Sequence, residues 1–180
     1  VADHGNHRLR RVRLDGTVTT WAGSFAGWVD GPITTARFHA PTGVHVGPKA
    51  NLWIADSNNH AIRRISPDGT VVTIAGRRSG SADSGSSHTA NFKYPTHAVM
   101  DNDGVLYIAD LDNSRVRARY PDGRVATIIG HVAGVSDGIG KAGGLSGPMG
   151  LLLYGGDLLV SDHRAHDVRR IKLAKKTCAD

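Results

Sequence analysis

The chain of 180 residues has little that would support several common kinds of site or anchor. Its single cysteine, Cys178, excludes an internal disulfide and any zinc site built from several thiolates. The apolar runs, among them residues 105–109 and 151–154, have the length of a strand and fall far short of the ~20 residues that span a membrane. Aromatic residues make up only 6% of the chain, which is few for a surface that stacks nucleic-acid bases. The charged residues and their pattern therefore carry the information.

The net charge of +6 permits a nucleic acid or an acidic surface as a partner but requires neither. The sequence contains no Walker loop, no glycine-rich dinucleotide fingerprint and no recognisable Ser-His-Asp arrangement. The 23 glycines indicate many tight turns. These features favour a globular protein rich in turns and give no sign of a catalytic motif.

One motif occurs four times along the chain. Its aspartates lie 53, 54 and 52 residues apart and are Asp3, Asp56, Asp110 and Asp162. In the first three copies an Asp-Gly turn and a short β-branched run follow the motif. A proline then opens the next hydrophobic stretch, at Pro41, Pro95 and Pro148. A constant phase of this kind indicates a repeat architecture.

Each repeat predicts four short strands separated by Gly and Asp turns, and no segment shows a sustained helical period. Four antiparallel strands per repeat are typical of a β-propeller blade, and such blades must stack on one another to bury both faces. We therefore predict an all-β fold of four-stranded antiparallel blades, with an incomplete ring within this chain. The predicted segments are a partial blade with strands 2–4 at residues 1–23, blades at 41–76 and 95–130, a partial blade with a basic tail at 148–180, and connectors at 24–40, 77–94 and 131–147.

The motif resembles the NHL repeat, named for its Asn-His-Leu core. The resemblance rests on Asn6-His7-Arg8-Leu9 and on the stretch Asp-Ser-Asn-Asn-His-Ala-Ile at residues 56–62. The third copy has Asn113-Ser114 and lacks the histidine, whereas the fourth has Ala165-His166 and lacks the asparagine. The resemblance implies a propeller, usually of six blades. About three and a half blades would then form an arc that needs missing propeller blades or a second copy to close the ring.

An arginine follows each motif aspartate at an offset of seven residues. In a hairpin with its turn between them, the two side chains would lie close together across the strands. We predict a carboxylate–guanidinium pair of similar geometry in every copy, at about 0.2–1 kcal/mol each if partly exposed. Four equal copies favour a structural role over a site. The arginines are Arg10, Arg63, Arg117 and Arg169.

Histidines raise the question of a metal. The spacing His4-x-x-His7 occurs again at residues 163–166, but the two pairs lie in separate blades, so we predict neither a metal site nor a cofactor. His97 stands where the other copies carry Gly43 and Gly150, and it is expected on an inner strand near the mouth of the channel. Peptidylglycine-amidating lyases have NHL-like propellers with several zinc-binding channel histidines, and this resemblance leaves a zinc-dependent lyase as one alternative.

The long connectors offer the best candidates for binding. Trp28 has no aromatic counterpart in the other connectors and is the leading contact candidate. Arg77, Arg78 and Lys93 have no aspartate partner in the repeat pattern, and Tyr94 beside Lys93 could stack a base. We predict a non-catalytic scaffold that binds a protein or peptide through its inter-blade loops. RNA binding on a basic face is the alternative.

Overall fold

The computed structural model of the protein describes residues 1–130, 134–139 and 142–173. The predicted basic tail beyond Leu173, including Lys175, Lys176 and Cys178, lies outside the described residues. The described part of the chain is all-β, apart from short 3-10 turns. These turns are η1 (His4–Asn6), η2 (Pro48–Ala50), η3 (Ser57–Asn59) and η4 (Leu111–Asn113).

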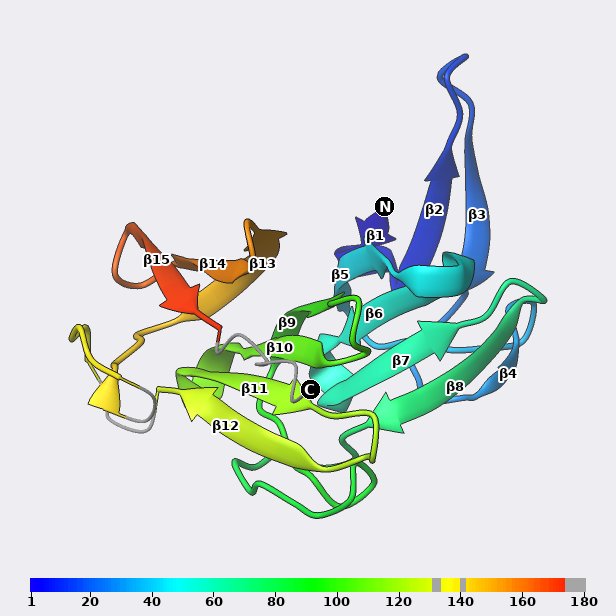
Figure 1. Ribbon diagram of the computed structural model, residues 1–180. Coiled ribbons are helices and arrows are strands. Elements are labelled where there is room, and N and C mark those ends of the chain that lie inside the picture. The colour runs from blue at the N-terminus through cyan, green and yellow to red at the C-terminus, as the bar shows by residue number, and fades with distance from the viewer. Residues whose placement is uncertain (131–133, 140–141, 174–180) are drawn as a thin grey trace, which may run out of the picture.

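The strands form four antiparallel sheets that follow one another along an arc, from blue to red in Figure 1. The first blade consists of β1 (Ala2–Asp3), β2 (Arg8–Val12) and β3 (Val18–Gly23). The second has the order β4-β8-β7-β6-β5 and consists of β4 (Gly31–Pro32), β5 (Pro41–Val46), β6 (Leu52–Asp56), β7 (Ala61–Ile65) and β8 (Thr70–Ala75).

The third blade consists of β9 (Pro95–Met100), β10 (Leu106–Asp110), β11 (Arg115–Arg119) and β12 (Val125–Ile129). The fourth consists of β13 (Pro148–Tyr154), β14 (Asp157–Asp162) and β15 (Asp167–Lys172). The strands that open the blades, β5, β9 and β13, lie next to one another. The all-β blade architecture predicted from the repeats is thus confirmed, and the described residues do not close a ring.

The motif turns share one backbone geometry. His7, His60 and Ser114 end the 3-10 turns η1, η3 and η4 with φ values of 58°, 53° and 53°. Each donates its backbone N–H to the carbonyl three residues earlier, which reverses the chain between the second and third strands of the blade. The left-handed conformation costs energy for a residue with a side chain, so the surroundings must hold it in place.

The hydrophobic core lies between the blades rather than within them. Phe38 lies between the first two blades together with Leu9, Ile54 and Val71. Phe92, at the same place in the next repeat, packs with residues of the second and third blades. A further cluster joins the third blade to the fourth through Tyr107 and other apolar side chains. Each blade therefore depends on its neighbours for stability.

The two ends of the arc expose blade surface. Among the described residues the first and fourth blades have three strands each. Val12 and Val18 are exposed on the first blade, and Leu152 and Val168 are exposed on the fourth. These apolar side chains have no neighbouring blade to cover them in the described structure.

Candidate functional site

The motif aspartates of the second and third blades are fully buried hydrogen-bond acceptors. Asp56 accepts hydrogen bonds from the backbone N–H of His39 at 2.7 Å, from Asn59 Nδ2 at 2.8 Å and from Arg63 Nη1 at 2.7 Å. Asp110 repeats this arrangement with the backbone N–H of Lys93 at 2.7 Å, Asn113 Nδ2 at 2.8 Å and Arg117 Nη1 at 3.0 Å. The carboxylate thus ties its own hairpin to the connector that precedes the blade.

The partner arginines are buried as completely as the aspartates. Arg63 donates through Nη2 and Nε to Asp30 Oδ1 at 2.6 and 3.1 Å, and to the carbonyl oxygens of Val29 and Arg37. Its guanidinium lies 5.2 Å from the centroid of the Phe38 ring. Arg117 makes the same set of contacts with Asp83, two connector carbonyls and Phe92. Each arginine therefore holds an acidic connector against its blade.

The predicted pair is absent from the first blade. Arg10 Nη1 donates instead to Thr20 Oγ1 at 2.6 Å, and Asp3 accepts from Asn6 Nδ2 at 2.9 Å. An acidic connector residue 33 or 34 positions earlier in the sequence covers Arg63 and Arg117, whereas no acidic side chain among the described residues forms a salt bridge with Arg10. Without that cover, Arg10 is not drawn into a buried cluster.

The predicted pair is also absent from the fourth blade. Arg169 forms salt bridges with Asp137 at 2.6 Å and with Asp167 at 3.5 Å. Asp162 accepts instead from the backbone N–H groups of Ser146 and Gly147. Ala165 stands where the middle blades have the bridging asparagine, so one side of the carboxylate cluster is missing. The expectation of four equal pairs was therefore wrong for the first and fourth blades.

The motif histidines join successive blades. His7 Nδ1 accepts from the backbone N–H of Ala40 at 3.1 Å, and His60 Nδ1 accepts from that of Tyr94 at 3.2 Å. Both donors have φ values near 54° and precede the proline that opens the next blade. Ser114 replaces the histidine in the third copy and donates to the carbonyl of Ser146 at 2.8 Å. The motif turns that end at His7, His60 and Ser114 thus connect each blade to the next one, and we call them linking turns.

His97 is held between inner strands. Its Nδ1 accepts from the backbone N–H of Leu151 on β13 at 3.1 Å. Burial, together with the nearby His45, lowers the pKa of His97. Two threonines also join the inner strands. Thr42 Oγ1 on β5 donates to the carbonyl of Thr96 on β9, and Thr96 Oγ1 donates to the carbonyl of Met149 on β13. His97 therefore contributes to the packing of inner strands.

Perturbed carboxyl groups in this chain have a structural cause. Burial raises the pKa of Asp110 to about 6, against the opposing effect of hydrogen bonds from Asn113, Lys93 and Arg117. Burial raises the pKa of Asp56 as well. A raised pKa in a cleft can indicate a catalytic acid, but here both carboxyls lie within saturated hydrogen-bond clusters between blade and connector.

No group of three or more His, Cys, Asp or Glu side chains that could hold a metal ion occurs in the part of the chain that the structure describes. Within those same residues, no helix is long and apolar enough to cross a membrane.

The predicted contact residue Trp28 lies on the connector between the first two blades. Its Nε1 donates to Thr73 Oγ1 at 3.0 Å, and the residue is 36% exposed. Phe25 and Val29 on the same connector are also exposed, Phe25 by 74%. We call these three exposed apolar residues of one connector the connector-1 patch. Phe25 was not among the contact candidates predicted from the sequence.

The predicted basic candidates lie on the next connector. Arg77, Arg78 and Lys93 are exposed, and none forms an ion pair with another described residue. Tyr94 is partly buried, with its ring centroid 6.5 Å from that of His4. The backbone N–H of Tyr94 donates to His60 Nδ1, so Tyr94 also takes part in the contact between the second blade and the third.

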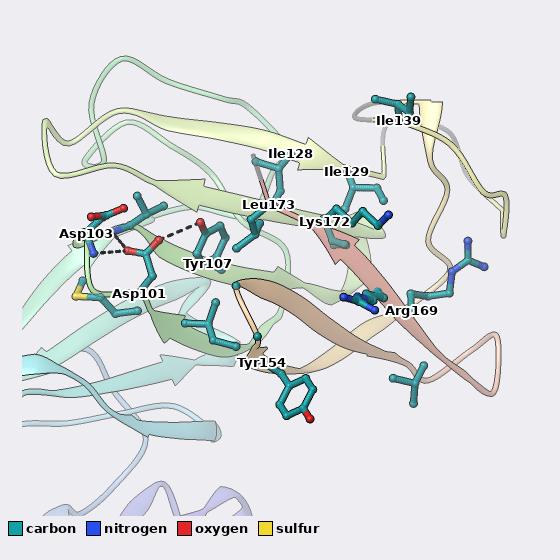
Figure 2. A pocket seen from close by; sticks show the side chains of 18 of the residues that line it. Asp101, Asp103, Tyr107, Ile128, Ile129, Ile139, Tyr154, Arg169, Lys172 and Leu173 are labelled. Atoms are coloured by element: carbon teal, nitrogen blue, oxygen red, sulfur yellow. Dashed lines mark hydrogen bonds between the residues drawn. The ribbon is translucent and has the colours of Figure 1, made fainter. Parts of the chain in front are cut away.

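A cleft of about 1370 Å³ opens between the third and fourth blades. Figure 2 shows Ile128, Ile129 and Leu173 on its apolar side and Arg169 and Lys172 beside β15. Asp101 accepts a hydrogen bond from Tyr107 at 3.1 Å at the far end of the cleft.

Known proteins with similar sequences contain the same kind of repeat. No family model matches the chain. Over 130 residues the chain is 36% identical to NHL repeat-containing protein 2 of Bos taurus, a match that covers 65% of this chain and 18% of that protein. The human protein of the same name is 31% identical over 142 residues, which cover 72% of this chain and 20% of the human one. The chain is a segment of NHL repeats.

This NHL segment spans about a fifth of the length of the curated relatives it matches. A solved structure from Bacteroides thetaiotaomicron, described as a protein of unknown function, superposes with a TM-score of 0.74 at 23% identity. That superposition covers 93% of this chain and 42% of the other. At this identity the likeness shows the fold alone, and it agrees with an arc of an NHL propeller.

Proposed function

We propose that this NHL segment is a non-catalytic binding module that holds a protein or peptide through its inter-blade connectors. The observation that carries the proposal is the connector-1 patch of Phe25, Trp28 and Val29, which is apolar and exposed on an ordered loop. Exposed aromatic side chains on a rigid loop are typical of protein contact sites.

The connector is held in place by its own repeat. The backbone N–H of Gly27 donates to the carbonyl of Phe38 at 3.0 Å, and Asn59 Nδ2 donates to the carbonyl of Gly27 at 2.8 Å. Together with the bond from Trp28 to Thr73, these contacts hold the connector in place at Gly27 and Trp28. A patch ordered in advance loses little conformational entropy when a partner binds.

The use of the repeated polar residues also supports a non-catalytic role. The aspartate, arginine and histidine of the motif are occupied with bonds between blades and connectors in the second repeat. A catalytic group needs a side chain that is free to meet a substrate. The zinc-dependent lyase alternative is tested by metal analysis of the purified protein, and stoichiometric zinc would favour it.

RNA binding is a second candidate, favoured by one observation. Arg77, Arg78 and Lys93 are exposed cations without an ion-pair partner among the described residues. Such cations can follow a phosphate backbone. The connector-1 patch comes from a different connector, so the basic residues and the exposed aromatic rings do not belong to one loop.

Selection of peptides from a displayed library against the protein tests the main proposal. The double variant Phe25→Ala, Trp28→Ala should lose at least tenfold in affinity for the selected peptides, because their apolar contacts would be removed. The control variant Leu14→Ala removes a fully exposed apolar side chain from the Arg13–Thr17 turn and should bind as the unmodified protein does. Equal binding by both variants would overturn the assignment to connector 1.

Titration with single-stranded RNA at several salt concentrations tests the alternative. Micromolar binding that weakens steeply with salt and is lost in Arg77→Ala, Arg78→Ala would favour RNA over a protein partner. We expect only weak binding that does not depend on these two arginines.

A further inference from the structure

Two arginines face each other across the interface between the second and third blades. In the second blade, Arg64 of β7 is opposite Trp53 of β6. In the third blade, Arg119 of β11 is opposite Leu106 of β10 and Val125 of β12. Residues that stand opposite each other in an antiparallel pair point to the same face of the sheet. Since Trp53, Leu106 and Val125 all belong to the core cluster between these two blades, both arginines point toward that interface.

The two like charges influence each other. Burial lowers the pKa of Arg119, Asp122 opposes this effect, and the charge of Arg64 lowers the pKa further. The side chain of Asp122 is 65% exposed and forms an ion pair with Arg124 at 3.8 Å. Neither Arg64 nor Arg119 forms an ion pair with another described residue. Two partly buried cations thus lie close together, and within the described structure no carboxylate is paired with either of them.

The same interface contains buried donors without an acceptor. The Nε atoms of Arg64 and Arg119 are buried and have no hydrogen-bond partner among the described residues. The same holds for Nε1 of Trp53, the cross-strand neighbour of Arg64. A buried donor that makes no hydrogen bond costs free energy, and a donor on a charged group costs more. An anion between the arginines would supply the missing acceptor, because its oxygens can accept from the Nε and Nη edge of a guanidinium group.

The equivalent places in the other two interfaces do not combine two cations. Between the third and fourth blades they hold the apolar residues Ala118 and Ile171. Between the first and second blades they hold Arg11 and the buried Ile65, and the Arg11 guanidinium lies 5.6 Å from the centroid of the Trp21 ring. The packing of neighbouring blades therefore does not require an arginine pair at this place. The pair is a property of the interface between the second and third blades.

We propose that Arg64 and Arg119 together bind a phosphate group between the second and third blades. A phosphate group carries a charge of about −1.5 to −2 at pH 7 and three strong acceptor oxygens, which matches two guanidinium groups. A carboxylate carries a single charge and would leave one arginine uncompensated. Guanidinium groups bind phosphate through paired N–H donors, so each arginine forms one side of the site. The phosphate is the free ion or part of a small phosphate monoester.

Isothermal titration calorimetry with inorganic phosphate, at an ionic strength kept constant with sodium chloride, tests the proposal. We expect saturable binding of one phosphate per chain. Arg119→Ile introduces the residue that the second and fourth blades have at this place, and it should weaken phosphate binding at least tenfold because contacts to a charged group are lost. Arg64→Ala, which copies the third blade, should have the same effect. The connector-1 patch contains neither arginine, so this proposal and the proposed function can fail independently.

A matched control and a second readout separate binding from stability. Arg77→Ala removes the same charge from an exposed place on a connector and should leave phosphate binding unchanged. Phosphate should raise the Tm of the unmodified protein by more than that of Arg119→Ile, since it binds the folded state of the former. In phosphate-free buffer, Arg119→Ile should have a Tm at least as high as that of the unmodified protein, because the repulsion between the two cations is removed.

Titration with phenyl phosphate and with acetate identifies the ligand chemistry. Phenyl phosphate that binds as tightly as inorganic phosphate would support a site for a monoester, and weaker binding of phenyl phosphate would support a site for the free ion. Acetate that binds as tightly as phosphate would overturn the proposal. Phosphate binding that is insensitive to both Arg119→Ile and Arg64→Ala would also overturn it, as would the absence of saturable binding of either phosphate compound.

Discussion

Arg63 and Arg10 occupy the same place in the repeat but have different surroundings. Arg63 is completely buried, is shared between Asp56 and Asp30, and lies against the Phe38 ring. Arg10 bonds to Thr20 and remains partly exposed. Removal of one partner from a buried ion pair leaves the other charge uncompensated, which costs far more than the loss of an exposed pair.

We therefore predict that Arg63→Met lowers the free energy of unfolding by about 3–5 kcal/mol. Arg10→Met should lower it by less than about 1 kcal/mol, since the residue has no buried carboxylate partner. Equilibrium urea unfolding of both variants measures the difference. Equal losses would show that burial of the arginine contributes little.

His97 predicts a dependence of stability on pH. Its pKa is lowered from 6.5 by burial, so the unfolded chain binds the proton more tightly than the folded protein. The stability that this group contributes is present above pH 6.5 and is lost as the pH falls below 6.5 and through the lowered pKa of the folded protein. His97→Gln, which cannot titrate, should show a smaller loss of urea midpoint between pH 7.5 and 6 than the unmodified protein. His88→Gln is the matched control at an exposed site and should leave the loss unchanged; a similar loss in His97→Gln would contradict the assignment.

At the scale of the element, the outer strands end in a glycine whose role the structure explains. Gly76 has a φ of 80°, and a Cβ at this position would collide with the carbonyl oxygen of His60. Gly23 and Gly130 meet the carbonyls of His7 and Ser114 in the same way. The end of the outer strand therefore packs directly on the linking turn, where no side chain fits.

Gly76→Ala should destabilise the protein by several kcal/mol, because it adds a collision with backbone to the strain of a positive φ. Gly16→Ala has the same sign of φ, 83°, but open space around it, and should cost about 1 kcal/mol. Thermal unfolding of the two variants gives the comparison. A loss in Gly76→Ala no larger than that in Gly16→Ala would mean that the turn moves aside.

The elements themselves could be predicted from the sequence. The repeated aspartates, the Asp-Gly turns and the prolines locate the strands of the middle blades, because each signal acts within a few residues. The strand β4 was not predicted, since Gly31–Pro32 shows no strand pattern and pairs with β8 about 40 residues away. Local signals contain no information about such a pairing.

The same limit applies to the polar cluster. The offset of seven suggested Asp56 beside Arg63, and the two do form a salt bridge. The second carboxylate, Asp30, lies on a connector 33 residues earlier in the sequence. This connector buries Arg63, and the corresponding arginine of the first blade, Arg10, is not buried in this way. The expected mild effect of losing a pair was therefore based on an exposure that Arg63 does not have.

At the scale of the whole molecule, the fold is an arc in which each blade is stabilised by its neighbours (Figure 1). The second and third blades have a neighbour on both faces, whereas the first and fourth have one each among the described residues. The stability of such an array is approximately the sum of unit and interface contributions. The requirement for missing blades or a second copy to close the ring stays a prediction.

Amide hydrogen exchange of the protein tests most directly the claim that contacts between blades stabilise the fold. We expect the amides of β6, β7, β10 and β11, in the two middle blades, to be protected at least tenfold more than those of β2 and β14 in the terminal blades. This gradient would follow from the number of interfaces that each blade has. Equal protection in all four blades would show that a blade with one neighbour is as stable as a blade with two, and it would contradict the account.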